Sequence, residues 1–341
     1  MNWIHANENL EEIRELLSID EADMQIDIRS SAALIDNTWS MTVSEKVWQE
    51  APILEGHSIY SPRTEWGGPV TLVKHVTSKK QVTVQGPTWR GLLYQRRIYP
   101  PAGEGYLVYN NVDCNTLIYN IVGQSFGSLF AFVETPCGVT TSARFRYQSF
   151  AEGLQAVLAD AGMRLDIAFF GEFPAAILGA EPVTRYANTV EISQDYGINF
   201  TSEIGNVELA NHCLALGSGE LAERMVLNVY RVGDQYYTER PASLAPEDVR
   251  TVLLDYGSVE NADDLMKSAL QRLEETAPQQ SITIDELGLD VNMKLGDQIN
   301  VRDRLTGLEA LSEVTQKILN IRQGVTTIDT QISVLNIREG S

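Results

Sequence analysis

The sequence predicts a β-rich α+β protein with two small antiparallel β-barrel domains and inserted α/β units. Three observations lead to this prediction. Apolar residues alternate along many short runs, such as Trp39, Met41 and Val43, which is typical of strands with one buried face. Glycine, proline and short polar stretches separate these runs, as hairpin turns require. A few other segments space their apolar residues at helical intervals.

The first hundred residues predict a short helix followed by strands. Leu10, Ile13, Leu16 and Leu17 fall at helical spacing. Alternation then begins at Met24 and continues to about residue 100, with further apolar positions at Ile26, Ile28, Val70, Leu72, Val82 and Val84. The turns between these runs are Gly67-Gly68-Pro69 and Ser78-Lys79-Lys80. We expect a small antiparallel barrel or sandwich here.

Residues 112–185 predict an inserted α/β unit. One helix carries Leu117, Ile118, Ile121 and Val122 on one face and stops at Gly123. A second helix begins at a capping box of Ser149 and Glu152, in which each side chain satisfies a free backbone amide, and it ends at Gly162. Leu165, Ile167 and Phe169 then resume strand alternation.

The remaining residues return to strands, with one acidic helix between them. Met225, Leu227 and Val229 alternate after the turn Gly217-Ser218-Gly219. Residues 261–275 predict the helix, and Ile328, Ile332 and Val334 alternate near the end. We therefore expect a first, discontinuous β-barrel domain in residues 1–111 with about 186–240, an α/β domain in 112–185, an acidic helical connection in 241–280 and a second β-barrel domain in 281–341.

Two distant parts of the sequence resemble one another. Gly56, Ile59, Gly67 and a hairpin at Val82 and Val84 are matched by Gly296, Ile299, Gly307 and a hairpin at Val325 and Ile328. Such a match describes two barrels built on one strand-turn-strand plan, although so sparse a match also arises by chance. Two similar barrels in one chain would give a trimer a ring with sixfold pseudosymmetry.

Composition indicates an ordered globular protein. Of 341 residues, 43% are apolar and 21% charged, which is unlike a disordered chain. The 26 basic and 46 acidic residues give a net charge of −20, which argues against a protein that grips nucleic-acid phosphates. Cys114, Cys137 and Cys213 have no paired spacing, so we expect reduced thiols. We also expect no export signal and no membrane-spanning segment.

The charge is unevenly distributed. Residues 60–100 contain seven basic residues and one acidic residue, whereas residues 244–290 contain eleven acidic and three basic residues. The two segments would attract each other across subunits. The alternative is that both are solvated faces, since exposed ion pairs contribute little stability.

We expect no catalytic, cofactor-binding or metal-binding residues. Gly123-Gln124-Ser125-Phe126-Gly127 matches the nucleophile motif of serine hydrolases, but a helix precedes it and His212 is the one histidine downstream. The histidines are isolated, and His212 beside Cys213 points to the opposite face of a strand. The glycine turn at Gly217 lacks the lysine of a phosphate loop.

A basic and aromatic island between residues 60 and 99 predicts a protein interface. Tryptophan and arginine are common interface anchors, and the same residue types also bind single-stranded nucleic acid, which the net charge disfavours. The predicted interface residues are Arg63, Trp66, Trp89, Arg90, Arg96 and Arg97.

Three motifs resemble the tail-tip or baseplate hub proteins of tailed phages. A hairpin of residues 67–76 and 82–85 leads into Gly86-Pro87-Thr88-Trp89-Arg90-Gly91-Leu92-Leu93 and then two arginines. The block from Asn206-Val207 to Arg224 is similar to a strand-turn-strand of that family, and residues 295–303 with the hairpin at 314–318 form the third match. The resemblance leaves the N-terminal segment and residues 234–264 uncovered.

This resemblance implies a structural protein, not an enzyme, that forms a homotrimeric ring and adapts sixfold tail rings to a threefold tip. Its implied partners are the distal tail ring, the tail tube and tip, spike or fibre proteins. DNA would only pass transiently through the channel, which acidic residues would line, and this chain alone would not enter a membrane. Its implied place is the virion tail, assembled in the cytoplasm of the host bacterium.

Two other functions stay open. A receptor- or carbohydrate-binding β module at the tail tip would use exposed tryptophan and tyrosine side chains as stacking platforms, and the exposure of Trp66 or Trp89 would distinguish it. A serine hydrolase would use Ser125 with His212. Fold alone does not decide among them.

Overall fold

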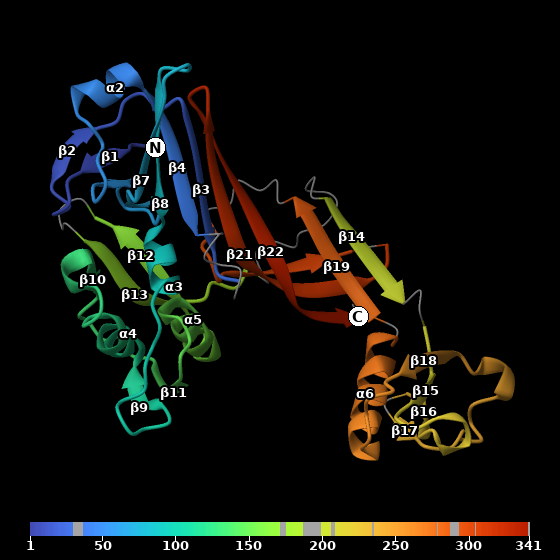
Figure 1. Ribbon diagram of the computed structural model, residues 1–341. Coiled ribbons are helices and arrows are strands. Elements are labelled where there is room, and N and C mark those ends of the chain that lie inside the picture. The colour runs from blue at the N-terminus through green and yellow to red at the C-terminus, as the bar shows by residue number, and fades with distance from the viewer. Residues whose placement is uncertain are drawn as a thin grey trace. The chain divides into compact units, whose positions relative to one another are not determined.

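The structure is a computed structural model that describes residues 1–29, 37–170, 175–186, 199–205, 209–233, 235–277, 279–286, 293–303 and 305–339. Two compact units make up the chain: Met1–Phe200 with Ile284–Ser341, here called unit 1, and Thr201–Thr283, called unit 2. Strands predominate in Figure 1, which confirms the β-rich α+β class. In the ranges given above, no helix is long and apolar enough to cross a membrane.

The largest sheet of unit 1 joins strands from both ends of the chain (Figure 1). Its order is β20, β21, β3, β4, β8, β7, and β22 pairs with the opposite edge of β21 along its whole length. All of these pairs are antiparallel. The strands are β3 (Glu21–Asp27), β4 (Thr38–Ser44), β7 (Leu72–Val76), β8 (Gln81–Pro87), β20 (Gln298–Arg302), β21 (Leu308–Arg322) and β22 (Val325–Glu339).

This sheet differs from the picture of two separate barrels. Residues 316–322 of β21 pair with residues 21–27 of β3, so the C-terminal hairpin shares a sheet with the N-terminal strands. Among the strands described here the sheets are open, and none closes on itself. Periodicity shows which face of a strand is buried, but it does not show which distant strand lies beside it.

The N-terminal segment is not the predicted helix. It forms β1 (Ile4–Ala6) and β2 (Glu12–Glu15), which join β5 (Ser58–Tyr60) and β6 (Gly67–Pro69) in the order β2, β1, β5, β6. The Asn7 side chain accepts hydrogen bonds from the amides of Asn9 and Glu11, a turn that competes with a helix. Leu10 has a φ of 62°, outside the helical region. Here local turn chemistry outweighs apolar spacing.

The two segments that resemble one another in sequence form the same turn. Gly56 and Gly296 have φ of 86° and 85°, a region that favours glycine. The backbone amide of Gly56 donates a hydrogen bond to the Val70 carbonyl, and the Val70 amide donates one to the His57 carbonyl. Equally, the Gly296 amide donates to Val314, whose amide donates back to Asp297. One turn leads into β5 and the other into β20, each with a buried isoleucine.

The predicted α/β part is confirmed in its helices. α4 (Cys114–Val122) buries its predicted face, and α5 (Phe150–Asp160) begins at the Ser149–Glu152 capping box. These helices pack on a sheet of β10 (Phe130–Phe132), β13 (Ala176–Pro182) and β12 (Met163–Phe169), in that order. Further elements are α2 (Glu45–Glu50), α3 (Trp89–Tyr94) and a ribbon of β9 (Leu107–Asp113) with β11 (Thr140–Phe145).

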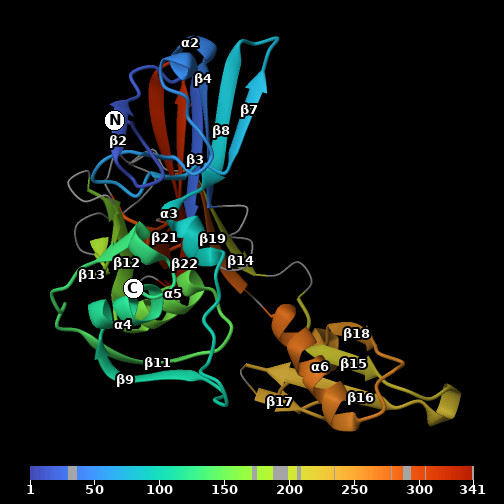
Figure 2. The same ribbon diagram turned by 60° about the vertical axis from the view of Figure 1, so that its left-hand side comes forward.

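Unit 2 has a core of its own. The predicted acidic helix, α6 (Ala262–Glu275), packs on a sheet in the order β17, β16, β15, β18 (Figure 2). These strands are β15 (His212–Leu216), β16 (Val226–Val232), β17 (Gln235–Tyr237) and β18 (Thr251–Asp255). The strands β14 (Asn199–Gly205) and β19 (Gln279–Glu286) pair in a ribbon, and each contains residues of both units. Asn206 and Val207 of the second motif lie outside the described residues.

Candidate functional site

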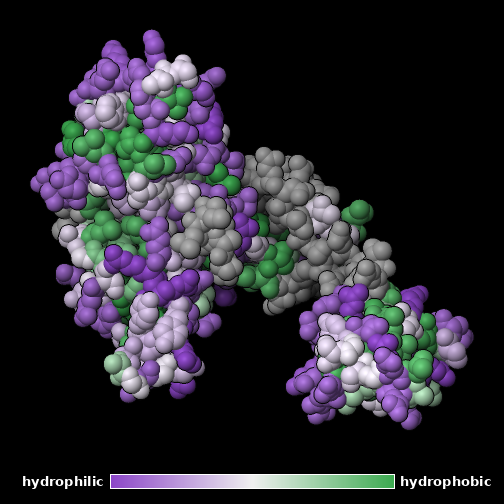
Figure 3. Space-filling model, viewed as in Figure 1, coloured by the Kyte–Doolittle hydropathy of each residue, from purple (hydrophilic) through white to green (hydrophobic). Residues whose placement is uncertain are grey.

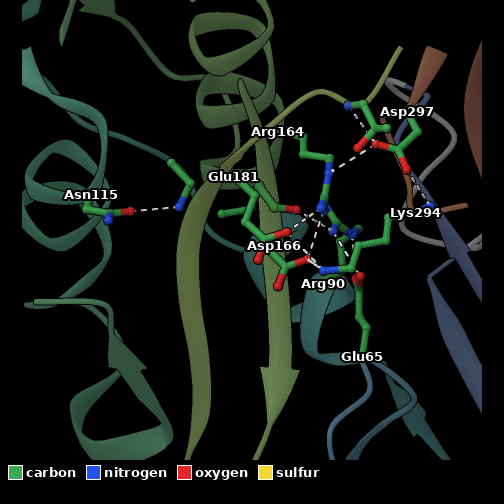
Figure 4. Close-up of polar contacts among 11 residues, drawn as sticks. Glu65, Arg90, Asn115, Arg164, Asp166, Glu181, Lys294 and Asp297 are labelled. Atoms are coloured by element: carbon green, nitrogen blue, oxygen red, sulfur yellow. Dashed lines mark hydrogen bonds and ion pairs between the residues drawn. The ribbon is translucent and has the colours of Figure 1, made fainter. Parts of the chain in front are cut away.

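A cluster of charged side chains lies on β12 and β13 of unit 1 (Figure 4). Arg164 on β12 is buried and forms ion pairs with Asp166, Glu181 and Asp297. Lys294 adds bonds of 3.0 Å to Asp166 and 2.9 Å to Glu181. Burial opposes ionisation of Asp166, but hydrogen bonds from Arg164 and Lys294 outweigh it and keep the pKa of the carboxyl below its usual value. The cluster thus joins the α/β part to the start of β20.

A second buried ion pair lies beside this cluster. Arg90 on α3 is 1% exposed, and its guanidinium contacts both carboxylate oxygens of Glu65, at 2.5 and 3.0 Å. The same guanidinium donates to the Leu165 carbonyl at 3.1 Å. Such two-pronged pairing fixes geometry as well as charge. Arg90 therefore fastens α3 and the loop before β6 to strand β12.

A cleft of about 270 Å³ opens beside these ion pairs. Its lining includes the cations Arg63, Arg90, Arg164, Lys294 and Lys317 and the acids Glu65 and Asp166. Trp66 also contributes to the wall. Seven of the residues that line this cleft are charged.

The structure separates the six predicted interface residues into two groups. Trp66, Trp89 and Arg90 are buried within the chain, and the Trp89 ring stacks on Phe169. Arg63, Arg96 and Arg97 are exposed. Arg96 lies 4.2 Å from the centre of the Phe126 ring, and Arg97 pairs with Glu152. These three arginines are the exposed members of the six, so the interface prediction now rests mainly on them.

The serine of the hydrolase-like motif follows α4 in a turn. The Ser125 amide donates to the Val122 carbonyl at 2.9 Å, so helix α4, and not a strand, leads into it. All four histidines have partners elsewhere. His5 bonds to His57, His75 bonds to Glu45, and the His212 ring bonds to Thr251 and Asn228. Ser125 thus has no histidine bonded to it in the part of the chain described.

Strand β22 forms a long free edge of the large sheet. It pairs with β21 on one side, and no other described strand pairs with it. Three of its apolar side chains are strongly exposed: Val325 at 64%, Ile328 at 44% and Leu335 at 50%. Asp329 is the single charged residue from Val325 to Leu335, and this stretch contains neither proline nor glycine. Elsewhere, the face of the molecule in Figure 3 is mostly hydrophilic with scattered apolar patches.

Sequence reasoning missed Arg164, Lys294 and Lys317. The one local signal was a lysine in the middle of a long apolar alternation, at Lys317 beside Ile318 and Leu319. Nothing in the local pattern connects it with Arg164, because the two residues are 153 positions apart. Only the pairing of distant strands brings the cations together.

Comparison with known proteins found similarity in structure. No family model matches this sequence, and no curated protein matches it. The chain is similar to tail proteins of phages.

The solved tail proteins in this comparison come from three bacteria. A tail protein from Neisseria meningitidis is 12% identical, with 97% of this chain and 96% of that chain covered and a TM-score of 0.43. The 43 kDa tail protein of prophage MuSo2 from Shewanella oneidensis is 11% identical, with 98% of this chain and 98% of that chain covered and a TM-score of 0.45. A prophage tail protein from Listeria monocytogenes is 10% identical, with 98% of this chain and 95% of that chain covered and a TM-score of 0.47. At such low scores and identities, these likenesses carry no inference about partners or activity.

Proposed function

We propose that this chain is a structural, non-enzymatic subunit of a phage-type tail tip or baseplate hub, and that copies of it associate into a ring. The observation that carries the proposal is the free edge of β22. The three sequence motifs that resemble hub proteins support the same function.

The β22 edge is built for pairing with another strand. Soluble proteins protect an exposed edge with charged residues, proline or bulges, because the unpaired amides and carbonyls otherwise recruit strands from other molecules. β7, at the other end of the sheet, has such protection: Lys74 is on the strand, and Lys79 and Lys80 are in the adjacent turn. β22 has fifteen residues, of which three are charged, and from Val325 to Val334 it carries one charge and no bulge of its own; its pairing with β21 is irregular at Leu335. A partner strand would satisfy its free backbone groups.

Ring closure follows from symmetry. If β22 paired with β22 of a second copy, the contact would be twofold and would stop at a dimer. If β22 instead pairs with a different surface of the next copy, the contact repeats from copy to copy, and it gives a ring when the rotation between copies closes. The strand-turn-strand segments that begin at Gly56 and Gly296 would each supply one part per subunit. The matching turns at Gly56 and Gly296 support this arrangement, which would let a trimer meet sixfold tail rings.

The proposed place of the ring is the virion tail, assembled in the host cytoplasm beside the tail tube, the distal tail ring and tip, spike or fibre proteins. DNA would pass through its channel without being held. A net charge of −20 suits this role, because acidic walls repel phosphates.

The receptor- or carbohydrate-binding alternative is weakened by one observation. It uses exposed tryptophan or tyrosine as a stacking platform, and of the two tryptophans expected to distinguish it Trp66 is 6% exposed and Trp89 is fully buried, whereas Tyr99 is exposed. Neither tryptophan ring is open to a sugar in this chain.

The test of the proposed function is assembly. Native mass spectrometry of the purified chain at micromolar concentration should show a trimer. Replacing Ile328→Lys together with Leu335→Lys should give a folded monomer, because two lysines on the edge oppose strand pairing. Leu221→Lys, at a position that is 96% exposed in unit 2, is the matched control and should leave the trimer intact. A wild-type chain that stays monomeric at all concentrations, or an edge variant that still forms the trimer, contradicts the proposal.

A further inference from the structure

The cleft described above contains a half-buried lysine, Lys317, that forms no ion pair with the described residues. Lys317 lies on β21, and its ammonium group has no hydrogen bond or ion pair to any described residue. Burial lowers the pKa of Lys317, and the charges of Glu65 and Asp297 oppose this effect only in part. A cation removed from water is unfavourable without an anion close to it. Lys317 can therefore form an ion pair with an anionic group of another molecule.

The acids near Lys317 are already occupied. Both oxygens of Glu65 bond to Arg90. Asp297 accepts from the amides of Thr184 and Lys294 and pairs with Arg164. Asp166 is bonded to Arg164 and Lys294. None of these carboxylates is free to turn toward Lys317 without leaving another cation unpaired.

Arg63 provides a second cation at the mouth of the same cleft. Its side chain is exposed and makes no bond to a described residue. Its backbone is held in place: φ is 61°, and its amide donates to the Phe169 carbonyl at 2.6 Å. Arg63 thus presents a guanidinium, the group best suited to two parallel hydrogen bonds with a carboxylate.

We propose that this cleft binds a side-chain carboxylate from an acidic segment of a second copy of this chain. The residues that line the cleft carry five basic side chains, Arg63, Arg90, Arg164, Lys294 and Lys317, against two acidic ones, Glu65 and Asp166, so the cleft favours an anionic ligand. A carboxylate is the anion that the side chains of a second copy can supply.

The chain itself offers an acidic segment of the required kind. Glu260, Asp263 and Asp264 lie within five residues, and all three are exposed. Asp264 forms an exposed ion pair with Lys267 at 3.7 Å, whereas Glu260 and Asp263 have no ion pair with a described residue. A neighbouring copy in the proposed ring would present this segment, so the choice of occupant rests on the proposed function. The binding of a carboxylate by the cleft can be tested without the ring.

The first experiment measures binding to the full-length chain with a synthetic peptide of residues 256–266. Trp66 in the cleft wall is the fluorescent reporter, and Trp66→Phe identifies its signal. Wild type should bind the peptide, and Lys317→Met and Arg63→Met should each bind it about tenfold more weakly, the effect of losing one charged contact. Lys74→Met, an exposed lysine on β7, is the matched control and should bind like wild type. A neutral version of the peptide, carrying Glu260→Gln, Asp263→Asn and Asp264→Asn, tests the need for charge.

Three results would overturn the proposal: equal binding of the neutral peptide, unchanged binding by both Lys317→Met and Arg63→Met, or tighter binding of inorganic phosphate than of the peptide.

A second experiment asks whether the contact forms between copies. In native mass spectrometry, Lys317→Glu alone and Asp263→Lys with Asp264→Lys should each reduce the trimer, and the chain with all three changes should recover it. If Lys317→Glu and the Asp263→Lys, Asp264→Lys pair each reduce the trimer but the chain with all three changes does not regain it, the acidic segment at 260–264 is not the segment that the cleft binds. If wild type binds the peptide but never forms a trimer, the proposed function fails while the carboxylate site stands.

Discussion

Buried charges define unit 1 at the scale of single residues. Arg90 and Arg164 are both inside the protein, and each bonds to carboxylates from other parts of the chain. Burying an ion pair adds little net stability, but removing one partner leaves a costly unpaired charge. These arginines therefore restrict how strand β12 can be placed against the loop at Glu65 and the turn at Asp297.

A buried histidine pair makes unit 1 sensitive to acid. His5 Nε2 lies 2.8 Å from His57 Nδ1. Burial, followed by the charges of His57 and Arg14, lowers the pKa of His5 from 6.5 to about 4. The folded state thus holds fewer protons than the unfolded state between these two pH values, and its stability falls as pH decreases through this window.

We expect the free energy of unfolding to fall less steeply between pH 6.5 and pH 4 in His5→Asn than in wild type. Urea unfolding at several pH values measures both slopes. Identical slopes for His5→Asn and wild type would show that His5 does not cause the acid sensitivity.

At the scale of elements, Gly68 and Gly86 lie where strands β6 and β8 approach each other closely. A Cβ on Gly86 would lie 1.9 Å from the Pro69 carbonyl oxygen, and one on Gly68 would lie 2.0 Å from the Pro87 oxygen. The Trp39 indole lies beside this contact, and its N–H donates a hydrogen bond to the Pro87 carbonyl at 3.0 Å. The motif residues thus bring β6 against β8 and direct the chain into α3.

Gly86→Ala should therefore destabilise the protein by about 3 kcal/mol or more, since backbone atoms cannot move aside as side chains can. Gly105→Ala is the matched control, because a Cβ there meets nothing within 4 Å, and its effect should stay within about 0.5 kcal/mol. Chemical unfolding followed by circular dichroism gives both values. Similar stabilities of the two variants would mean that β6 and β8 are not packed this closely.

At the scale of the whole molecule, two cores share one chain. The core of unit 2 consists of residues from β15, β16 and α6, while the α/β core of unit 1 includes Leu154 and Phe169. Unit 1 also closes the longest loop in the chain, because β3 pairs with β21. Contacts so distant in sequence form slowly during folding.

Calorimetry should therefore resolve two unfolding transitions. Leu273→Ala removes a fully buried side chain from unit 2 and should destabilise only that unit, by about 2–5 kcal/mol. Leu154→Ala, equally buried, should shift only the transition of unit 1. A single transition that both variants lower together would show that the units unfold as one.

Part of the candidate site could be predicted from the sequence. Arg63 belongs to the basic island, and its neighbours suggested an interface. Trp89 and Arg90 lie in the same island but are buried, because α3 turns them toward the core. Neither Lys317 nor the free edge of β22 could be predicted, since both depend on which strands become neighbours.

The sequence by itself determined the local elements: the capping box that starts α5, the apolar stripes of α4 and α6, and the alternation of the strands. It also determined the turn shared by Gly56 and Gly296. These features depend on residues close together in the chain, where spacing and turn chemistry act directly. Only the tertiary structure decided the pairing of β3 with β21, the burial of Trp89 and Arg90 and the cleft around Lys317. Such features arise from contacts across up to three hundred residues, about which local periodicity carries no information.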